Sequence, residues 1–434
     1  MVEGYIGRPY SDCGGRIREV MVNYQTNTHE AVRSCISAMP HASFIVFCGS
    51  SPKEQYGQYK EKRGALIRSG HRVQLDYWER MLGCGDTSVA VGYYNELLGG
   101  KRDMEMSGDT DNDIYRAACT FLEMAASWHY HNNFNLGGGK YEKYSAKQLK
   151  GEFPGQVELV RVGYPIHNYA RDAVLSLSNG GRRLIVPGVS SHSGGLMSML
   201  GSNYERQADD PVWERRGYVT GERLDLEHIA GGAIVSSENH IFLGVNPWSY
   251  RTDNDDREKG LAQVMRFAEG LEMHQFWHPS VINHIDVYAL PGDDGSLYIA
   301  DPFMTADMLS SHVDIGPDMK FMERHFDFCG RLREHCQYNG FRTTPIPFWV
   351  ADYGGLPTMF SYANALKEPG KVYVGRKSDM RRDRRLAEIG KALDDRFFRA
   401  ASADSEVHIL GGFQEPSVWT DSGLRCVANV VMRE

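Results

Sequence analysis

The chain has 434 residues, with 48 Lys and Arg against 56 Asp and Glu, which gives a net charge of −8 at pH 7. Hydrophobic residues make up 41% and charged residues 24%, as in ordinary globular proteins, so fibrous and disordered classes are excluded. The acidic balance argues against nucleic acid as a partner. Apolar runs such as 44–48 are far shorter than a transmembrane helix, so we expect no membrane partner.

Eight cysteines are spread along the sequence without a Cys-x-x-Cys pair. Residues 1–12 lack a charged start followed by an apolar segment, so we expect no secretory signal. Both observations favour reduced thiols and a cytoplasmic location over a disulfide framework. Because most free cysteines are small buried hydrophobes, none is assigned to catalysis on its own.

The predicted elements alternate short apolar strands with amphipathic helices. Strands are expected at 42–48, 71–78 and 157–162, and helices at 53–69, 113–126, 256–273, 317–338 and 377–400. Strand pairs are expected at 173–178 with 183–187, at 233–235 with 240–245 and at 284–290 with 296–300, and a last strand at 424–432. The recurring unit of a strand pair, a helix and another strand predicts one repeated α/β domain.

Three motifs imitate metal or phosphate sites, but each lacks a required residue. His129 and His131 have no cysteine or carboxylate nearby to complete a ligand set. The acidic segment 109–113 lacks the Gly and Glu that a calcium loop needs further on. The glycine-rich segment 137–140 is followed by Tyr instead of Ser or Thr. We therefore expect no metal and no cofactor.

Four short segments place ionisable or glycine residues at the edge of strand-like apolar runs. They contain Arg171-Asp172, Gly231-Gly232, His284-Ile285-Asp286 and Arg425-Cys426. On a strand, His284 and Asp286 would share one face and could point into one pocket. Taken singly, each residue fits an ordinary core or surface position, and only the set in this order indicates a site.

In these segments the chain resembles the pentein superfamily of guanidino-group-modifying enzymes. Its members include arginine, agmatine and peptidylarginine deiminases, dimethylarginine hydrolases and amidinotransferases. Arg171-Asp172 is similar to the family's first-carboxylate segment, and His284-Ile285-Asp286 is similar to its His-x-Asp motif. Gly423-Leu424-Arg425-Cys426 is similar to the Gly-x-x-Cys of its C-terminal nucleophile.

Three accessory segments also resemble the family. Residues 11–22 resemble the opening strand of arginine deiminases and amidinotransferases, and residues 361–365 resemble the penultimate repeat of agmatine deiminases. Gly244 with Arg251-Thr252 is similar to a turn of the hydrolases. One position departs from the pattern, because many members have an acidic residue before the two glycines and this chain has Ala230.

In place of an acidic residue at position 230, the chain could use Glu227 or Asp225 after a local shift. Alternatively, the site uses Asp172 and Asp286 alone. The resemblance implies an α/β fold, a five-bladed propeller with pseudo-fivefold repeats, loop insertions and a site on its axis. We expect one catalytic domain at 11–434 after an N-terminal tail at 1–10, with insertions near 79–112 and 128–156. A homo-oligomer is left open.

These residue types suit guanidino chemistry. A guanidinium is a planar cation, which two carboxylates can hold by bidentate hydrogen bonds. A thiolate is a suitable nucleophile for its carbon, and a histidine can protonate the departing amine and then activate water. The predicted catalytic residues are Cys426 as nucleophile, His284 as general acid and base, and Asp286, which also orients the histidine. The predicted substrate-binding residues are Asp172, Asp286 and Arg251.

The sequence therefore predicts a hydrolase that converts a small-molecule guanidino group to a ureido group and ammonia through a thiouronium intermediate. An amidinotransferase, which passes the amidino group to an amine, is the first alternative, and Arg251-Thr252 favours the hydrolase. A thiol peptidase or acyltransferase would use Cys426 and His284 without the two carboxylates. A catalytically idle binding protein is the third alternative, because of Ala230.

Overall fold

The computed structural model describes residues 7–24, 28–49, 145–162, 166, 170–187, 204–220, 231–245, 262, 264–277, 284–353, 356–378, 384–412 and 424–434. The elements predicted at 53–69, 71–78 and 113–126 lie outside these residues, as do Arg251 and the three motifs that imitate metal or phosphate sites. Among the described helices, none has the length and apolar character needed to cross a membrane.

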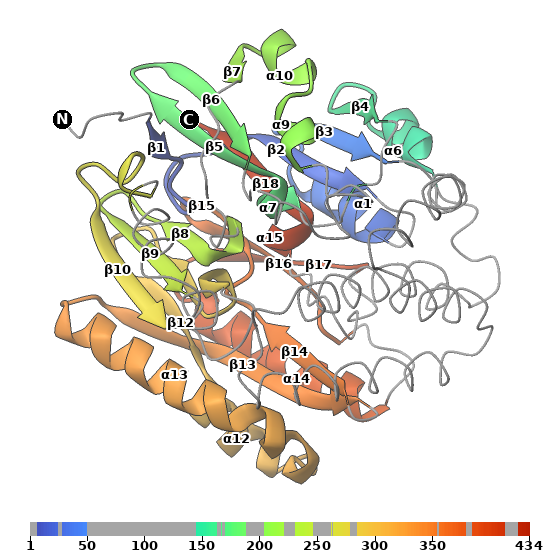
Figure 1. Ribbon diagram of the computed structural model, residues 1–434. Coiled ribbons are helices and arrows are strands. Elements are labelled where there is room, and N and C mark those ends of the chain that lie inside the picture. Colours follow the sequence, from blue (N-terminus) through green and yellow to red (C-terminus); the bar gives the residue numbers. More distant parts are fainter. Residues whose placement is uncertain are drawn as a thin grey trace, which may run out of the picture.

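The described strands form five separate sheets, each of three or four strands (Figure 1). In chain order the strands are β1 (Arg8–Pro9), β2 (Ile17–Tyr24), β3 (Ser43–Cys48), β4 (Val157–Arg161), β5 (Val174–Asn179), β6 (Arg182–Pro187), β7 (Tyr218–Thr220), β8 (Ile234–Ser236), β9 (His240–Val245), β10 (Glu272–Trp277), β11 (Ala289–Pro291), β12 (Leu297–Asp301), β13 (Thr343–Tyr353), β14 (Leu356–Ser361), β15 (Leu366–Glu368), β16 (Lys371–Gly375), β17 (Glu406–Leu410) and β18 (Ala428–Arg433). The sheets run β1-β5-β6-β7, β10-β9-β8, β11-β12-β13-β14, β15-β16-β17 and β18-β2-β3-β4.

All five sheets contain the same three-strand unit, in which two strands are antiparallel and the third is parallel to the second. The units are β5-β6-β7, β8-β9-β10, β11-β12-β13, β15-β16-β17 and β18-β2-β3. The last unit joins distant parts of the chain, because β18 pairs with β2. The predicted repeat within an α/β fold is therefore present.

The helices are α1 (His29–Ala38), α6 (Ala146–Glu152), α7 (Ala170–Ala173), α9 (Tyr204–Ala208), α10 (Val212–Arg215), α12 (Pro302–Ser310), α13 (Met319–Tyr338), α14 (Arg384–Ala401) and α15 (Leu424–Val427), and the 3-10 turns are η3 (Gly231–Ala233), η4 (Ile285–Val287) and η5 (Gly316–Asp318). The long helices α13 and α14 pack against β13. In α14 the buried side chains of Leu386, Ile389, Leu393 and Phe397 recur every three or four residues, which is the period of one helix face.

Two of the predicted strands begin too early in the sequence. In the segment predicted as a strand at 284–290, residues 285–287 form the turn η4, and the strand β11 begins only at Ala289. In the segment predicted at 424–432, the helix α15 precedes β18. Periodicity over a few apolar residues does not distinguish one helical turn from a strand. The prediction that His284 and Asp286 share one face of a strand is therefore wrong.

The helix predicted at 256–273 is also too long at its C-terminal end. Gly270 has φ of 75°, a conformation that favours glycine and commonly ends a helix, and Glu272 already belongs to β10. At the N-terminus, Arg8 and Pro9 pair with β5, although the sequence analysis assigns both residues to a tail.

Asp318 connects η5, β13 and the start of α14. Its fully buried carboxylate accepts hydrogen bonds from Trp349 Nε1 at 2.7 Å, from the backbone N–H of Asp352 at 2.7 Å and from Arg385 Nη2 at 2.6 Å. It thereby holds η5 against β13 and the start of α14. Removal of this acceptor would leave buried donors without a partner.

We expect Asp318→Ala to lower the free energy of unfolding by about 3–5 kcal/mol, the cost of breaking a buried pair. The denaturation midpoint in urea measures this loss. Asp327→Ala is the matched control, because Asp327 forms only an exposed pair with Arg331 on α13 and should change stability by less than about 0.5 kcal/mol. Equal effects of the two substitutions would contradict the assigned role of Asp318.

Candidate active site

A short element precedes the first strand of each three-strand unit, and these five elements meet in a ring. The elements are α15, α7, η3, η4 and the bend at residues 362–365. In space α15 contacts α7, α7 contacts η3, and η3 contacts η4. Figure 1 shows α7 and α15 side by side where the sheets come together.

The bend at 362–365 closes this ring on both sides. The backbone N–H of Arg425 donates to Asn364 Oδ1 at 2.9 Å, which joins the bend to α15. On the other side, Ser361, the last residue of β14 and directly before the bend, donates from Oγ to the backbone carbonyl of Val287 in η4 at 2.6 Å. Residues that are far apart in sequence thus occupy equivalent positions in five neighbouring units.

The ring is tight at the glycine pair of η3. A Cβ atom on Gly231 would clash with the backbone carbonyl of Arg171, and one on Gly232 would clash with the imidazole ring of His284. Both glycines are required here for close approach rather than for backbone conformation. The pair that the sequence singled out therefore sets the spacing between α7, η3 and the histidine.

Asp12, from the segment before β2, lies at the centre of a cluster of buried charges. Its carboxylate accepts hydrogen bonds from both terminal nitrogens of Arg171 at 3.3 Å and from the backbone N–H of Ser236 at 2.8 Å. It also forms an ion pair with Arg425 Nη2 at 2.5 Å. Burial alone would raise the pKa of Asp12, but Arg171 and Arg425 lower it to about 2.

The carboxylate of Asp286 joins this cluster to the predicted general base. Asp286 is fully buried, and its Oδ2 lies 3.6 Å from Arg171 Nε. Its Oδ1 lies 3.9 Å from Nδ1 of His284, whose side chain is 14% exposed. His284 is the residue just before η4, where its extended backbone leads into the turn. The two residues thus come together across the start of a turn.

The backbone places the other two predicted residues in the same ring. Asp172 lies in α7, directly after Arg171, and Cys426 lies in α15, directly after Arg425. Arg425 is almost fully buried, so α15 is held in place by the ion pair with Asp12. Arg251, which the sequence predicts to bind substrate, lies outside the described residues, as do Ala230, Glu227 and Asp225.

Five other cysteines have side chains that the structure describes, and each is a free thiol. Burial raises the pKa of all five, to about 11 for Cys48 and to about 12 for Cys336, and raises it also for the others, Cys13, Cys35 and Cys329. A raised pKa keeps a thiol protonated and unreactive. None of these five thiols is therefore in an environment that activates a nucleophile.

The sequence motifs include the segments that hold Asp12, Arg171 and Asn364, but no role was predicted for these residues. The basic residues nearest to Asp12 in the sequence are Arg8 and Arg16, so its pairing with Arg171 and Arg425 could not be predicted from spacing.

Comparison with known proteins gives matches among solved structures only: no known family profile matches the chain, and no curated protein does. The agmatine deiminase of C. jejuni matches with a TM-score of 0.51 and 10% identity over 99% of this chain and 97% of that chain. Its substrate-bound Cys-to-Ser variant matches with a TM-score of 0.50 and 10% identity over 95% and 92% of the two chains.

A protein proposed to be a peptidyl-arginine deiminase matches with a TM-score of 0.52 and 12% identity over 98% of both chains. At these identities the matches identify the fold. The chain has the α/β fold of solved pentein structures, which confirms, for the fold, the resemblance seen in the sequence motifs.

We expect Gly232→Ala to lower the free energy of unfolding by roughly 1–3 kcal/mol, because the added methyl group overlaps the imidazole of His284. Denaturation in urea measures the change. Gly330→Ala on α13 is the control, since its Cβ would meet no atom within 4 Å and alanine favours a helix by about 1 kcal/mol. A neutral Gly232→Ala would contradict the close packing of this ring.

The lowered pKa of Asp12 predicts acid sensitivity. Because the pKa falls from 3.8 to about 2 on folding, the stabilisation is complete above about pH 4 and is lost as the pH falls toward 2. The loss amounts to about 2 kcal/mol. Unfolding free energies measured from pH 5 to pH 2 should fall less steeply for Asp12→Asn than for the unmodified chain. Parallel curves would show that this carboxylate is not linked to folding.

Proposed function

We propose that the protein is a cysteine-dependent hydrolase that converts a guanidino group to a ureido group and releases ammonia. The observation that carries this proposal is the ring of five short elements, one from each sheet. Asp172 belongs to α7, His284 directly precedes η4 and Cys426 belongs to α15, although more than a hundred residues separate each from the next. We also propose that the five sheets are blades of a propeller, with this ring on its axis.

The matched solved structures support the choice of a guanidino group. The structures with TM-scores of 0.50 or more carry the names of an agmatine deiminase and of a proposed peptidyl-arginine deiminase, and all match nearly the whole chain. The agmatine deiminase was solved with substrate as a Cys-to-Ser variant, which accords with the proposal of a cysteine nucleophile. The proposed catalytic domain therefore covers residues 11–434.

The sequence predicts two roles for Asp286, orienting His284 and binding the substrate. We propose that the first is its main role, because of the residues that surround it. Its carboxylate is fully buried and faces Arg171 and His284, so it acts chiefly by orienting the histidine. Binding of the substrate guanidinium then falls first to Asp172, with Asp286 contributing from behind. Arg251 completes the proposed set of substrate-binding residues.

The proposed reaction has two steps. The thiolate of Cys426 attacks the guanidinium carbon, and His284 protonates the nitrogen that leaves as ammonia, which gives a covalent thiouronium. Water then attacks the same carbon while His284 takes up its proton. The carbon–sulfur bond breaks, the electron pair returns to the sulfur of Cys426, and the ureido product leaves.

Hydrolysis rather than amidino transfer is the form we propose, because the matched structures with TM-scores of at least 0.50 are named as deiminases. The two outcomes differ in the acceptor. A hydrolase forms ammonia and ureido product in water alone, whereas a transferase needs an added amine such as glycine and forms a new guanidino compound.

A screen of free arginine, agmatine, methylarginine and an arginine-containing peptide should identify one substrate that yields ammonia and a ureido product without added amine. Cys426→Ser should lower this turnover by roughly 10⁴-fold or more, since it removes the nucleophile while changing one atom. Cys48→Ser is the control, because Cys48 is a half-buried thiol outside the ring and should keep the full rate.

Near-normal turnover in Cys426→Ser would refute the assignment of the nucleophile. Product that appears only with glycine would replace the hydrolase by an amidinotransferase. The absence of any product with a folded protein, together with slow reaction of Cys426 toward a haloacetamidine reagent, would favour a binding protein without activity.

A further inference from the structure

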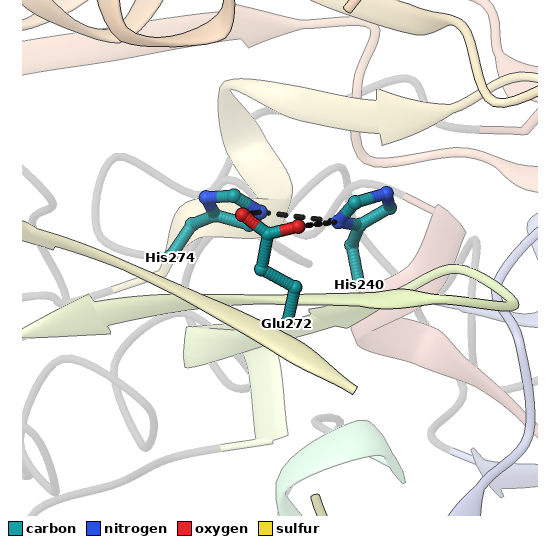
Figure 2. Close-up of side chains that lie close together, drawn as sticks. All are labelled: His240, Glu272 and His274. Atoms are coloured by element: carbon teal, nitrogen blue, oxygen red, sulfur yellow. Dashed lines mark hydrogen bonds and ion pairs between the residues drawn. The ribbon is translucent and has the colours of Figure 1, made fainter. Parts of the chain in front are cut away.

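Three side chains that commonly bind metals lie together on one face of the sheet β10-β9-β8. Glu272 and His240 are direct partners in the parallel pairing of β10 with β9. His274 is two residues beyond Glu272 and so projects to the same face. Figure 2 shows the carboxylate of Glu272 between the two imidazole rings, with all three side chains turned toward one another.

The distances within this cluster are close to those of a tetrahedral metal centre. His240 Nδ1 lies 3.2 Å from His274 Nε2 and 3.5 Å from Glu272 Oε2, and His274 Nε2 lies 3.8 Å from Glu272 Oε1. Zinc bonds of about 2.0–2.2 Å at tetrahedral angles hold their ligand atoms roughly 3.3–3.6 Å apart. One nitrogen from each histidine and the carboxylate can therefore bind a single ion with little movement.

We propose that His240, Glu272 and His274 form a binding site for one divalent transition-metal ion of the zinc class. Two imidazoles and a carboxylate are a ligand set that zinc uses with water in the fourth position. The exposed fractions of the side chains fit this arrangement, because His274 is 3% exposed, His240 25% and Glu272 60%. The site is anchored on its inner side and open to water on its outer side.

Contacts beyond the three ligands hold His274 in the orientation that binding requires. Its second ring nitrogen, Nδ1, lies 3.0 Å from His335 Nε2 on α13. Its ring stacks on Phe242 at a centroid distance of 5.0 Å, and the edge of Phe341 packs against it. A hydrogen bond to the far nitrogen of a ligating histidine is a regular feature of metal sites, where it fixes the ring and its tautomer.

The position of the cluster separates it from the candidate active site. In β8 the turn η3 precedes Ile234, whereas the hairpin to β9 follows Ser236 at the other end of the strand. His240 begins β9 at that hairpin end. The ion would join β9 to β10 directly and, through His335, would connect this sheet to α13 of the next unit. The proposed metal site is therefore separate from the ring, and it does not depend on the proposed hydrolase activity.

The sequence analysis expected no metal because it looked for ligands that are near one another along the chain. Glu272 and His274 form a Glu-x-His pair, but we had assigned them to the end of a helix or beyond it. Their partner His240 lies in the preceding strand of the sheet and becomes adjacent only through the parallel pairing of β9 with β10.

Zinc sulfate titrated against a chromophoric chelator, with the full-length protein, tests this proposal. We expect one equivalent of zinc to bind to the unmodified chain and to raise its melting temperature. His240→Gln and Glu272→Gln should each weaken binding by roughly tenfold or more, since loss of even an outer-shell partner costs about that much. Both side chains are partly exposed, so the variants should fold.

Two controls distinguish this site from other zinc ligands. His408→Gln is the matched histidine control, because His408 is a strand residue of similar exposure that pairs with a single glutamate, Glu406, at 3.2 Å. Cys426→Ser tests for zinc bound to the proposed nucleophile. Both variants should bind zinc as tightly as the unmodified chain, whatever the outcome of the activity screen.

Three results would overturn the proposal. If the unmodified chain binds no zinc at micromolar concentrations, the three side chains form a hydrogen-bonded chain with His335 and nothing more. If zinc binds but both His240→Gln and Glu272→Gln retain full affinity, the ion is held elsewhere. Binding that is lost in Cys426→Ser and kept in His240→Gln would likewise assign the zinc to the active-site thiol.

Discussion

The pairing of Asp12 with Arg171 and Arg425 is the interaction on which the centre of the molecule depends. Two guanidinium groups lie close together in a buried region, where their mutual repulsion is poorly screened. A single carboxylate from the opening segment compensates both charges, and Asp286 adds a second negative charge beside Arg171. The two arginines belong to α7 and α15. The ion pairs that balance their charges therefore also fix the positions of α7 and α15 in the ring.

This arrangement explains why the residues proposed for chemistry sit on turns. A strand would continue past the centre, but a single helical turn ends there and presents its backbone and side chains to its neighbours. Gly231 and Gly232 make room for the carbonyl of Arg171 and for the ring of His284. The ring thus combines close backbone contacts and paired charges with buried apolar side chains such as Ile285 and Leu424.

Much of the repeat could be predicted from the sequence, because strands such as β5, β6 and β9 show clear apolar patterns bounded by turn residues. The order of Asp172, His284 and Cys426 also indicated the family. The turns α15 and η4 could not be predicted, since three or four apolar residues fit a strand equally well. The partners of Asp12 and the cluster at His240 depend on contacts between distant segments, about which periodicity carries no information.

The pairing of β18 with β2 has a consequence for the order of events during folding. Arg433 in β18 donates a hydrogen bond to the carbonyl of Gly15, 418 residues away. During synthesis, β2 must therefore wait with an open edge until nearly all of the other units have been made. Contacts of such long range form slowly. The pairing of β18 with β2 is thus a late step in folding. Until then the open edge of β2 needs protection from pairing with other strands.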